Sequence, residues 1–495
     1  MLKARGLDVP SVIRGIAWFH RWTGVALCAA FTVWFASGLV MVFVPFPGLS
    51  DADRRGSAQA IARPAGLIAP SIALAAGGGG ETLRLVSVAG RPVYVTGDAE
   101  LRAIDANTGT GLPPISAEAA RTIAADFADA PVASIDGAFR YDQWVVHNRF
   151  DPWRPLFRVS IDDADGSQLY VSAVTGEVVQ RTRAAERAWN WIGAIPHWLY
   201  FTAIRKDWGL WDNAMWTIAL VGVFTAVAGT GLGLCRTVKR MQGRRPDWSA
   251  FRGWLRWHHG LGLAAAVFVL VWMVSGWLSM DHGRLFSKGK PLPEAVAAYR
   301  GAPLAVAISG IPASAFADLG GAYEIRFVVV DGIPLAAAYS AGSARVQRLD
   351  APAPATDVLP GDFLSRAVAK HWPVSTPTGL GPGPEDRLYR DADGLAPTAL
   401  RFDLTQPKDA AVYIDAVTGQ PVALIDNSRK AYAWVYYAMH TSKFAGLEDR
   451  PILRKSLQVG PLLLGLIFSL TGIVLAFRRV WPKRGRSNHR AASGA

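Results

Sequence analysis

Long apolar runs without charged residues interrupt the chain at four places. They cover residues 22–50, 213–235, 257–280 and 456–477. A helix of about 20 apolar residues crosses a hydrocarbon core of about 30 Å, so each run is long enough to span a bilayer. The first run is longer than the apolar part of a secretory signal, and no small-residue cleavage site follows it. The sequence therefore predicts a membrane protein with four transmembrane α-helices, the first of them a retained anchor.

The long segments between these runs contain short stretches in which apolar and polar residues alternate. Stretches 169–172 and 412–415 alternate in this way, lead into a Thr-Gly turn at Gly176 or Gly419, and are followed by another apolar run. This pattern is typical of a β-hairpin. Alanine-rich stretches such as 116–130 begin with a Ser or Asp that can cap a helix. We therefore expect each long segment to fold as a small α+β domain.

These patterns divide the chain into spans, α+β domains and short basic connections. The predicted parts are an N-terminus at 1–14, spans at 15–45, 211–235, 255–280 and 456–478, α+β domains at 46–210 and 281–455, a basic loop at 236–254 and a basic tail at 479–495.

The two halves of the chain repeat one another. Five residues of the first span recur in the third span at a constant offset of 238. They are His20, Gly24, Trp34, Ser37 and Gly38, which match His258, Gly262, Trp272, Ser275 and Gly276. The repeat continues in the α+β segments, where A-V-T-G follows a strand-like stretch in both halves. A repeat on this scale predicts two tandem units, each with a span, an α+β domain and a second span.

The charge of the chain is concentrated beside the spans. The 495 residues carry a net charge of +13, and their mean hydropathy is +0.19. The N-terminus, the basic loop and the tail, with the adjoining span ends, hold 17 basic and two acidic residues, which leaves 35 basic and 37 acidic residues elsewhere. Short cytoplasmic segments retain Lys and Arg, so both termini are predicted to be cytoplasmic and both α+β domains exported. Positive-inside topology explains the basic pI, and no nucleic-acid partner is expected.

Histidine is the residue most suited to chemistry within the spans. Positions i, i+4, i+14 and i+18 share one face of a helix. His20, Gly24, Trp34 and Gly38 therefore form one stripe, and His258, Gly262, Trp272 and Gly276 form another. Such a stripe could seat a haem, because imidazole binds iron, glycine leaves room for a flat ring and an aromatic side chain packs beside it. Two matching histidines could bind one iron from opposite sides.

A second interpretation of these stripes needs no cofactor. Glycines on one face also permit close packing of helices, and a histidine at the end of a span can lie among lipid headgroups. His259 adjoins His258 but points about 100° away from it. It has no counterpart in the first span, so a headgroup contact or a supporting role is expected for it, and which of the two faces the interior stays open.

His197 and His440 form a second matched pair, each just before an even-numbered span. Both lie among Trp and Tyr residues. An aromatic belt at the membrane interface would explain these aromatic residues, but it does not explain why histidine recurs at the same place. The sequence contains no G-x-S-x-G, H-E-x-x-H, Walker or C-x-x-C-H motif, and no recognisable nucleotide-binding motif. If the protein moves electrons, a separate donor must deliver them.

These motifs together resemble the PepSY-associated transmembrane proteins, a family that includes siderophore-iron reductases of the bacterial inner membrane. The features are H-R-W-T-G and H-H-G-L-G at the span entries, Thr-Gly within spans two and four, the repeated V-T-G turns, and the histidine before each even-numbered span. The resemblance covers nearly the full chain. It implies a multi-pass inner-membrane protein with two periplasmic PepSY-like domains.

The resemblance also implies a function. In some members two b-type haems pass electrons outward to a ferric siderophore. Carried over to this chain, His20 and His258 would serve a haem near the cytoplasmic face, and His197 and His440 a haem near the periplasmic face. Reduction lowers the charge of the hard ferric ion and weakens its bonds to oxygen donors.

The substrate surface and the donor are less defined by the sequence. His147, with Trp144 and Arg149 nearby, is a speculative siderophore contact, against the alternative of a solvated loop. The identity of the siderophore, the cytoplasmic or membrane electron donor and the oligomeric state stay open. The alternative function is a non-enzymatic, membrane-anchored PepSY sensor or a peptidase-inhibitory interaction protein.

Overall fold

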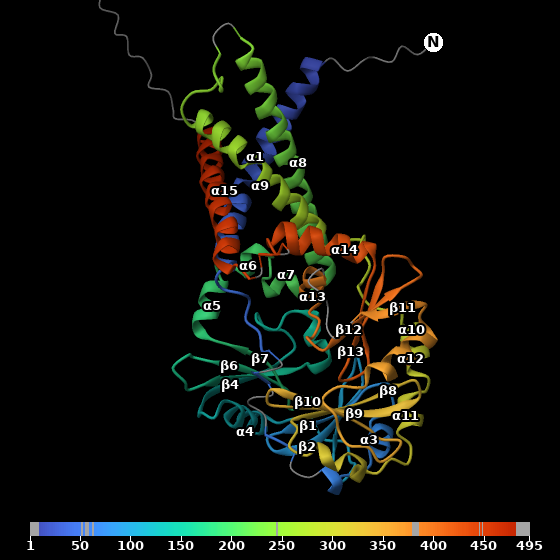
Figure 1. Ribbon diagram of the computed structural model, residues 1–495. Coiled ribbons are helices and arrows are strands. Elements are labelled where there is room, and N and C mark those ends of the chain that lie inside the picture. Colours follow the sequence, from blue (N-terminus) through green and yellow to red (C-terminus); the bar gives the residue numbers. More distant parts are fainter. Residues whose placement is uncertain are drawn as a thin grey trace, which may run out of the picture.

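The computed structural model describes residues 9–481, apart from 51–52, 55–58, 62–63, 244–245, 379–385, 445 and 448. Much of the predicted N-terminus 1–14 and of the predicted tail 479–495 lies outside the described residues. Figure 1 shows a helical bundle at one end of the molecule and three β-sheets at the other. We call the end of the bundle next to the sheets the sheet-side end. The opposite end carries the connection between the second and third long helices, and we call it the loop-side end.

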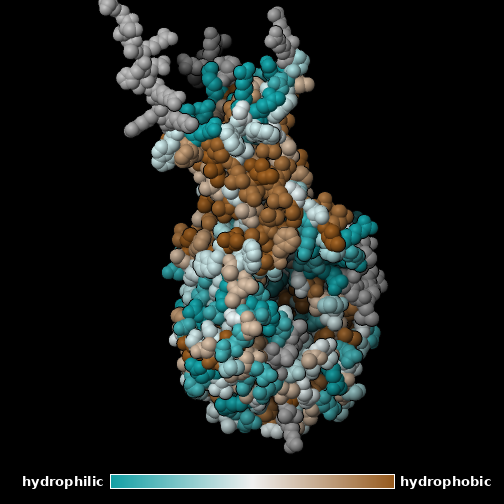
Figure 2. Space-filling model, turned by 90° about the vertical axis from the view of Figure 1, so that its left-hand side faces the viewer, coloured by the Kyte–Doolittle hydropathy of each residue, from teal (hydrophilic) through white to brown (hydrophobic). Residues whose placement is uncertain are grey.

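The bundle consists of four long helices that match the four predicted spans. They are α1 (Val9–Met41), α8 (Trp208–Met241), α9 (Trp254–Ser279) and α15 (Pro451–Val480). Each is long and apolar enough to cross a membrane, which confirms the prediction of four such helices. On the face that Figure 2 shows, apolar side chains cover the middle of the bundle, as expected of a surface in contact with lipid. α8 and α15 extend beyond the predicted spans 211–235 and 456–478 at both ends, because polar and basic residues continue the helix where the apolar run stops.

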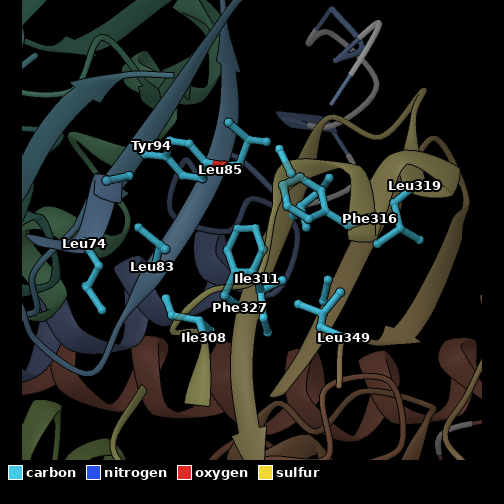
Figure 3. Packing of buried hydrophobic residues seen from close by; sticks show 14 of the residues in the cluster. Leu74, Leu83, Leu85, Tyr94, Ile308, Ile311, Phe316, Leu319, Phe327 and Leu349 are labelled. Carbon is cyan, nitrogen blue, oxygen red and sulfur yellow. The ribbon is translucent and has the colours of Figure 1, made fainter. Parts of the chain in front are cut away.

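One six-stranded antiparallel sheet contains strands from both predicted α+β domains. Its order is β10-β9-β8-β1-β2-β3, and the two halves join where β1 pairs with β8, with Leu85 opposite Ile325. The strands are β1 (Leu83–Val88), β2 (Arg91–Thr96), β3 (Arg102–Asp105), β8 (Glu324–Val330), β9 (Ile333–Ser340) and β10 (Ser343–Arg348). Tyr94, Phe316 and Phe327 pack together in the core on one face of this sheet, as Figure 3 shows. The two segments therefore share a sheet and a core, which the sequence pattern does not predict.

Each segment also contains a four-stranded antiparallel sheet of its own. The first has β4 (Val132–Phe139), β5 (Leu156–Ile161), β6 (Gln168–Ser172) and β7 (Val178–Thr182), and the second has β11 (Val374–Thr378), β12 (Ala399–Leu404), β13 (Ala411–Asp415) and β14 (Pro421–Ile425). The predicted Thr-Gly hairpins are β6–β7 and β13–β14. Gly176 and Gly419 have φ of +75° and +68°, and a Cβ there would lie 2.7 Å from Val88 Cγ1 and Val330 Cγ2 respectively. Glycine therefore lets each hairpin turn pack on the six-stranded sheet.

Short helices fill the space around the sheets and connect them to the bundle. They are η1 (Pro64–Gly66), α3 (Pro70–Ala76), α4 (Ala117–Ala128), η2 (Asn148–Trp153), α5 (Ala184–Asn190), α6 (Ala194–His197), α7 (Thr202–Arg205), α10 (Pro293–Arg300), α11 (Leu304–Ala307), η3 (Ala313–Leu319), α12 (Gly361–His371), α13 (Arg387–Asp393), α14 (Asn427–Ala433) and the π-helical η5 (Trp434–His440). Ser116 caps α4 by accepting a hydrogen bond from the Ala119 amide, as its sequence predicts. α6 packs against α1 and η5 packs against α9, at the sheet-side end of the bundle.

A buried group of charges lies where the two segments meet. Arg84 of β1 donates to Glu177 at 2.9 Å and to Glu324 of β8 at 3.4 Å, and Arg326 donates to Glu324 at 2.9 Å. Burial acts to raise the pKa of Glu324, but the guanidinium groups of Arg326, Arg84 and Arg54 outweigh it and lower this pKa to about 2. The carboxylate of Glu324 is therefore charged at neutral pH and links the two halves of the sheet.

Candidate functional site

The four matched histidines lie in two pairs, one at each end of the bundle. His20 of α1 and His258 of α9 line one cavity at the loop-side end, and we call them the loop-side pair. His197 ends α6 and His440 ends η5, and we call them the sheet-side pair. The rings within each pair lie within electrostatic range of each other. The structure thus brings together the histidines that occupy matching positions in the two halves of the chain.

The imidazole of His20 is held in one tautomer by a backbone carbonyl. Its Nδ1 lies 3.0 Å from the carbonyl oxygen of Thr225 in α8. A carbonyl can only accept, so Nδ1 must carry the proton, and Nε2 then keeps its lone pair.

The other three imidazoles reach the same state through a hydroxyl group. Their Nδ1 contacts are His258 to Thr471 Oγ1 at 2.9 Å, His197 to Ser37 Oγ at 2.9 Å and His440 to Ser275 Oγ at 3.1 Å. Each hydroxyl proton is already donated to a carbonyl of its own helix: Thr471 to Phe468 at 2.6 Å, Ser37 to Val33 at 2.5 Å and Ser275 to Trp272 at 3.4 Å. The hydroxyl oxygens therefore accept a hydrogen bond from Nδ1–H.

All four Nε2 atoms are left with a lone pair and, among the described residues, with no hydrogen-bond donor. Histidines that bind a metal through one ring nitrogen nearly always donate the other N–H to a carbonyl, carboxylate or similar acceptor, which fixes the ring and its tautomer. The four rings thus share the hydrogen-bonding state of metal ligands.

A cavity of about 500 Å³ opens between the four long helices at the loop-side pair. Its volume lies within the roughly 300–1,000 Å³ range of ligand and cofactor sites. His20, Gly24, His258, Gly262 and Phe468 line it. A Cβ added at Gly24 would have nothing within 4 Å, so this glycine faces open space, as predicted for a ring-binding stripe. Three arginines, Arg21, Arg236 and Arg479, also line the cavity, and no acidic side chain among the described residues does so.

The other predicted glycines make room for protein rings. A Cβ at Gly38 would lie 3.3 Å from Leu462 Cδ2 and 3.6 Å from His197 Cε1, and one at Gly276 would lie 2.9 Å from His440 Cε1. A Cβ at Gly262 would lie 2.9 Å from Phe468, whose ring stacks on His258 with centroids 4.8 Å apart. The expectation that Gly38, Gly262 and Gly276 leave space for a macrocycle is therefore corrected, because side chains of the protein itself, Leu462, Phe468 and His440, lie closest to them.

The predicted tryptophans differ in their contacts. Trp34 donates from Nε1 to the backbone carbonyl of His197 at 3.2 Å, so it helps to fix the sheet-side pair. Trp272 packs in the bundle core, with its ring 6.2 Å from that of Phe35. Gly229 makes a contact that the sequence did not predict, although it begins a glycine-rich run in α8. A Cβ there would lie only 2.4 Å from His20 Cε1.

The chain matches a known protein family over most of its length. The family model of the PepSY-associated TM region matches residues 17–479. The chain belongs to this family. No curated protein and no solved structure matches the chain. The PepSY-associated TM match includes all four long helices and both histidine pairs.

The structure decides between the two adjacent histidines of this PepSY-associated TM protein. His259 is buried, and both of its ring nitrogens have partners. Its Nδ1 lies 2.8 Å from Ser249 Oγ, and its Nε2 lies 3.1 Å from the carbonyl oxygen of Gly233. Because that carbonyl takes the Nε2 proton, His259 has no free nitrogen directed at the cavity. It anchors the α8–α9 connection, and His258 is the candidate ligand.

The three speculative substrate residues lie close together but differ in accessibility. Trp144 is 5% exposed and packs in a hydrophobic cluster, so its prediction as a substrate contact is corrected. His147 and Arg149 lie at the surface, and Nδ1 of His147 accepts a hydrogen bond from the Arg149 amide at the start of η2. Partial desolvation of its imidazole by the surrounding residues, together with the nearby Arg205, Arg149 and Arg154, lowers the pKa of His147 to about 4. His147 is therefore neutral at pH 7.

Within the described ranges, no three His, Cys, Asp or Glu side chains gather into a metal-binding group. A haem iron takes four ligands from its porphyrin and needs only two from the protein. A site for haem iron would therefore need only a pair of imidazoles, and not a group of three side chains.

Proposed function

We propose that this protein is a haem-containing electron-transfer protein of the bacterial inner membrane that reduces the iron of ferric siderophores in the periplasm. The observation that supports this most is the common state of His20, His258, His197 and His440. Each has a protonated Nδ1 bound to a neighbouring helix and an Nε2 with a free lone pair.

The residues at the loop-side pair fit a haem. Two imidazoles with free Nε2 atoms line a cavity of about 500 Å³, and Gly24 leaves open space in it. A bound haem would supply a one-electron carrier, and two imidazole ligands would leave no open position for oxygen. The protein's own contribution is to fix the tautomer through Thr225 and Thr471 and to surround the site with apolar side chains. His197 and His440, fixed by Ser37 and Ser275, would hold a second haem.

The distribution of charge supports the direction of electron transfer. The described basic residues Arg236, Lys239, Arg240, Arg478 and Arg479 lie at the loop-side end, which the positive-inside rule would place in the cytoplasm. The sheets would then lie in the periplasm. A reduced carrier on the cytoplasmic side would give up one electron, and a ferric chelate on the sheet side would gain it. Its iron then becomes ferrous, and its bonds to oxygen donors weaken.

A reduced-minus-oxidised absorption spectrum of the purified full chain tests this proposal. We expect the bands of a b-type cytochrome with haem in about twofold excess over protein. His20→Ala and His258→Ala should each remove the same half of the signal, and His197→Ala and His440→Ala the other half. His371→Gln, a change in α12 far from the bundle, should leave the spectrum unchanged.

A second measurement follows the reaction itself. Protein reduced with dithionite and freed of excess reductant is mixed with a ferric siderophore, and a ferrous-specific dye records the product. Loss of the reduced bands with equal appearance of ferrous iron supports the proposal. A colourless protein after expression with ample haem would contradict it and would favour a membrane-anchored sensor.

A further inference from the structure

A buried arginine lies beside the sheet-side pair with part of its hydrogen-bonding capacity unused. Arg205, at the end of α7, is 0% exposed. Its Nη1 donates to Asn148 Oδ1 at 3.1 Å, but Nε and Nη2 have no partner among the described residues. A buried guanidinium without an acceptor is costly, so a ligand that supplies one would be stabilised there.

Aromatic rings hold Arg205 in place without neutralising it. Its guanidinium lies over the rings of Tyr200 at 5.1 Å, Trp208 at 4.7 Å and Trp211 at 4.7 Å. Cation–π contacts with these rings stabilise the buried guanidinium. They leave its positive charge and its two unpartnered nitrogen atoms, Nε and Nη2, in place.

Further arginines lie around Arg205, and they outnumber the acidic residues beside them. Arg149, Arg154 and Arg205 all lie within electrostatic range of His147, and Arg140 and Arg205 both lie within range of Arg154. Of the four arginines, only Arg154 has an ion pair within the described part of the chain, with Asp151. The nearby Asp207 caps α8 by accepting from the Leu210 amide. The described basic residues at the ends of α8 and α15 lie at the opposite end of the bundle, so the positive-inside rule does not explain this excess.

The cluster is connected to the sheet-side histidines through two tyrosines. Tyr200 lies under the guanidinium of Arg205 and within electrostatic range of Arg149. It also lies within range of Tyr436, whose ring stacks on His440 with centroids 6.0 Å apart. An anion at Arg149 and Arg205 would therefore lie next to the residues that surround His440.

We propose that Arg149 and Arg205 bind an anionic oxygen ligand of the carboxylate class, with Arg149 as the exposed contact and Arg205 as the buried one. Arginine suits this role because its planar N–H groups match a carboxylate. Two sources carry this chemistry: an anionic ferric chelate that approaches from outside, or the propionate groups of a haem at the sheet-side pair. Both sources rest on the proposed function, but the anion site itself does not.

Calorimetric titration of the full chain in non-ionic detergent with citrate tests the site. Haem-free and haem-loaded protein are both titrated, so a failure of the haem proposal does not hide the result. We expect citrate to bind haem-free protein, more weakly as salt is raised, and about tenfold more weakly in Arg149→Gln and Arg205→Lys. Arg91→Gln removes a surface charge from β2 and should leave the affinity unchanged.

The two sources give different results with haem-loaded protein. If it still binds citrate, and ferric citrate as well, the ligand comes from outside. If haem-loaded protein no longer binds citrate, the site holds propionate groups, and Arg149→Gln should then also lower the haem content. An absence of citrate binding in both forms overturns the proposal. So does an affinity within about twofold of the wild type in both arginine variants, since Arg205 would then only fill its aromatic cage.

Discussion

Ser37 of α1 and His197 of α6 are 160 positions apart in the sequence and are joined by a hydrogen bond of 2.9 Å between Ser37 Oγ and His197 Nδ1. Ser275 of α9 makes the corresponding contact with His440 at 3.1 Å. In each case a hydroxyl on a long helix fixes the tautomer of a histidine outside that helix. For the sheet-side pair, the residue that fixes each tautomer is therefore one of the five residues that recur between the first and third spans.

Ser37→Ala should weaken haem binding at the sheet-side pair. Without the acceptor, His197 can rotate or adopt the other tautomer, and loss of such a supporting group typically costs about 10- to 100-fold in metal affinity. The rate of haem transfer from the purified protein to apomyoglobin measures this effect. Ser279→Ala is the matched control, because that hydroxyl also lies in a long helix but donates only to the Gly276 carbonyl. Equal transfer rates in the two variants would contradict the role of Ser37.

Gly229→Ala should disturb the loop-side pair selectively. The new Cβ would lie 2.4 Å from Cε1 of His20, so the ring must move and lose its hydrogen bond to Thr225. We expect the loop-side half of the haem signal to fall while the sheet-side half remains. Gly231→Ala lies two residues further along α8, has nothing within 4 Å of its Cβ, and should be tolerated or slightly stabilising. A normal spectrum in Gly229→Ala would show that the His20 position is not required.

The sequence predicted the elements of the fold better than their assembly. The four spans follow from long apolar runs, and the hairpins follow from alternation and Thr-Gly turns, because these signals are local. The pairing of β1 with β8 was not predicted, since it joins strands more than 200 residues apart whose edges carry no distinguishing pattern. For the same reason Arg205 went unnoticed, because its aromatic cage and its unpaired N–H groups exist only in the folded chain. His20 and His258 were found because the repeat places them in register, whereas the choice against His259 required its hydrogen bonds.

The charged group between the two halves of the six-stranded sheet should make the stability of this sheet depend on pH, with a loss of stability in acid. The pKa of Glu324 is about 2 in the folded protein and near its ordinary value of about 4.3 when unfolded. A lowered pKa stabilises the fold above the unfolded value, so this contribution is complete above about pH 5 and is lost as the pH falls towards 2. It amounts to about 3 kcal/mol.

Thermal unfolding between pH 3 and pH 7 measures this contribution. Glu324→Gln should lower the Tm at pH 7, because Arg84 and Arg326 lose their shared carboxylate, and should flatten the pH dependence. Asp362→Asn removes a carboxylate from an exposed pair with Arg366 and serves as the control, with little expected change. An unchanged pH profile in Glu324→Gln would show that the group does not hold the sheet together.

Gly176→Ala should loosen the docking of the β6–β7 hairpin on the six-stranded sheet. Two costs add at this position: the backbone has φ of +75°, and the new Cβ would lie 2.7 Å from Val88 Cγ1. Gly342, in the β9–β10 turn, has φ of +76° with nothing within 4 Å of its Cβ, so Gly342→Ala incurs only the backbone cost of about 1–2 kcal/mol. Gly176→Ala should destabilise the protein by this backbone cost plus the roughly 1–3 kcal/mol typical of overpacking. Hydrogen exchange of the β6 and β7 amides and the Tm of both variants measure the difference. If the two glycines prove equally sensitive, the contact with Val88 contributes nothing, and the left-handed turn alone explains why glycine stands at position 176.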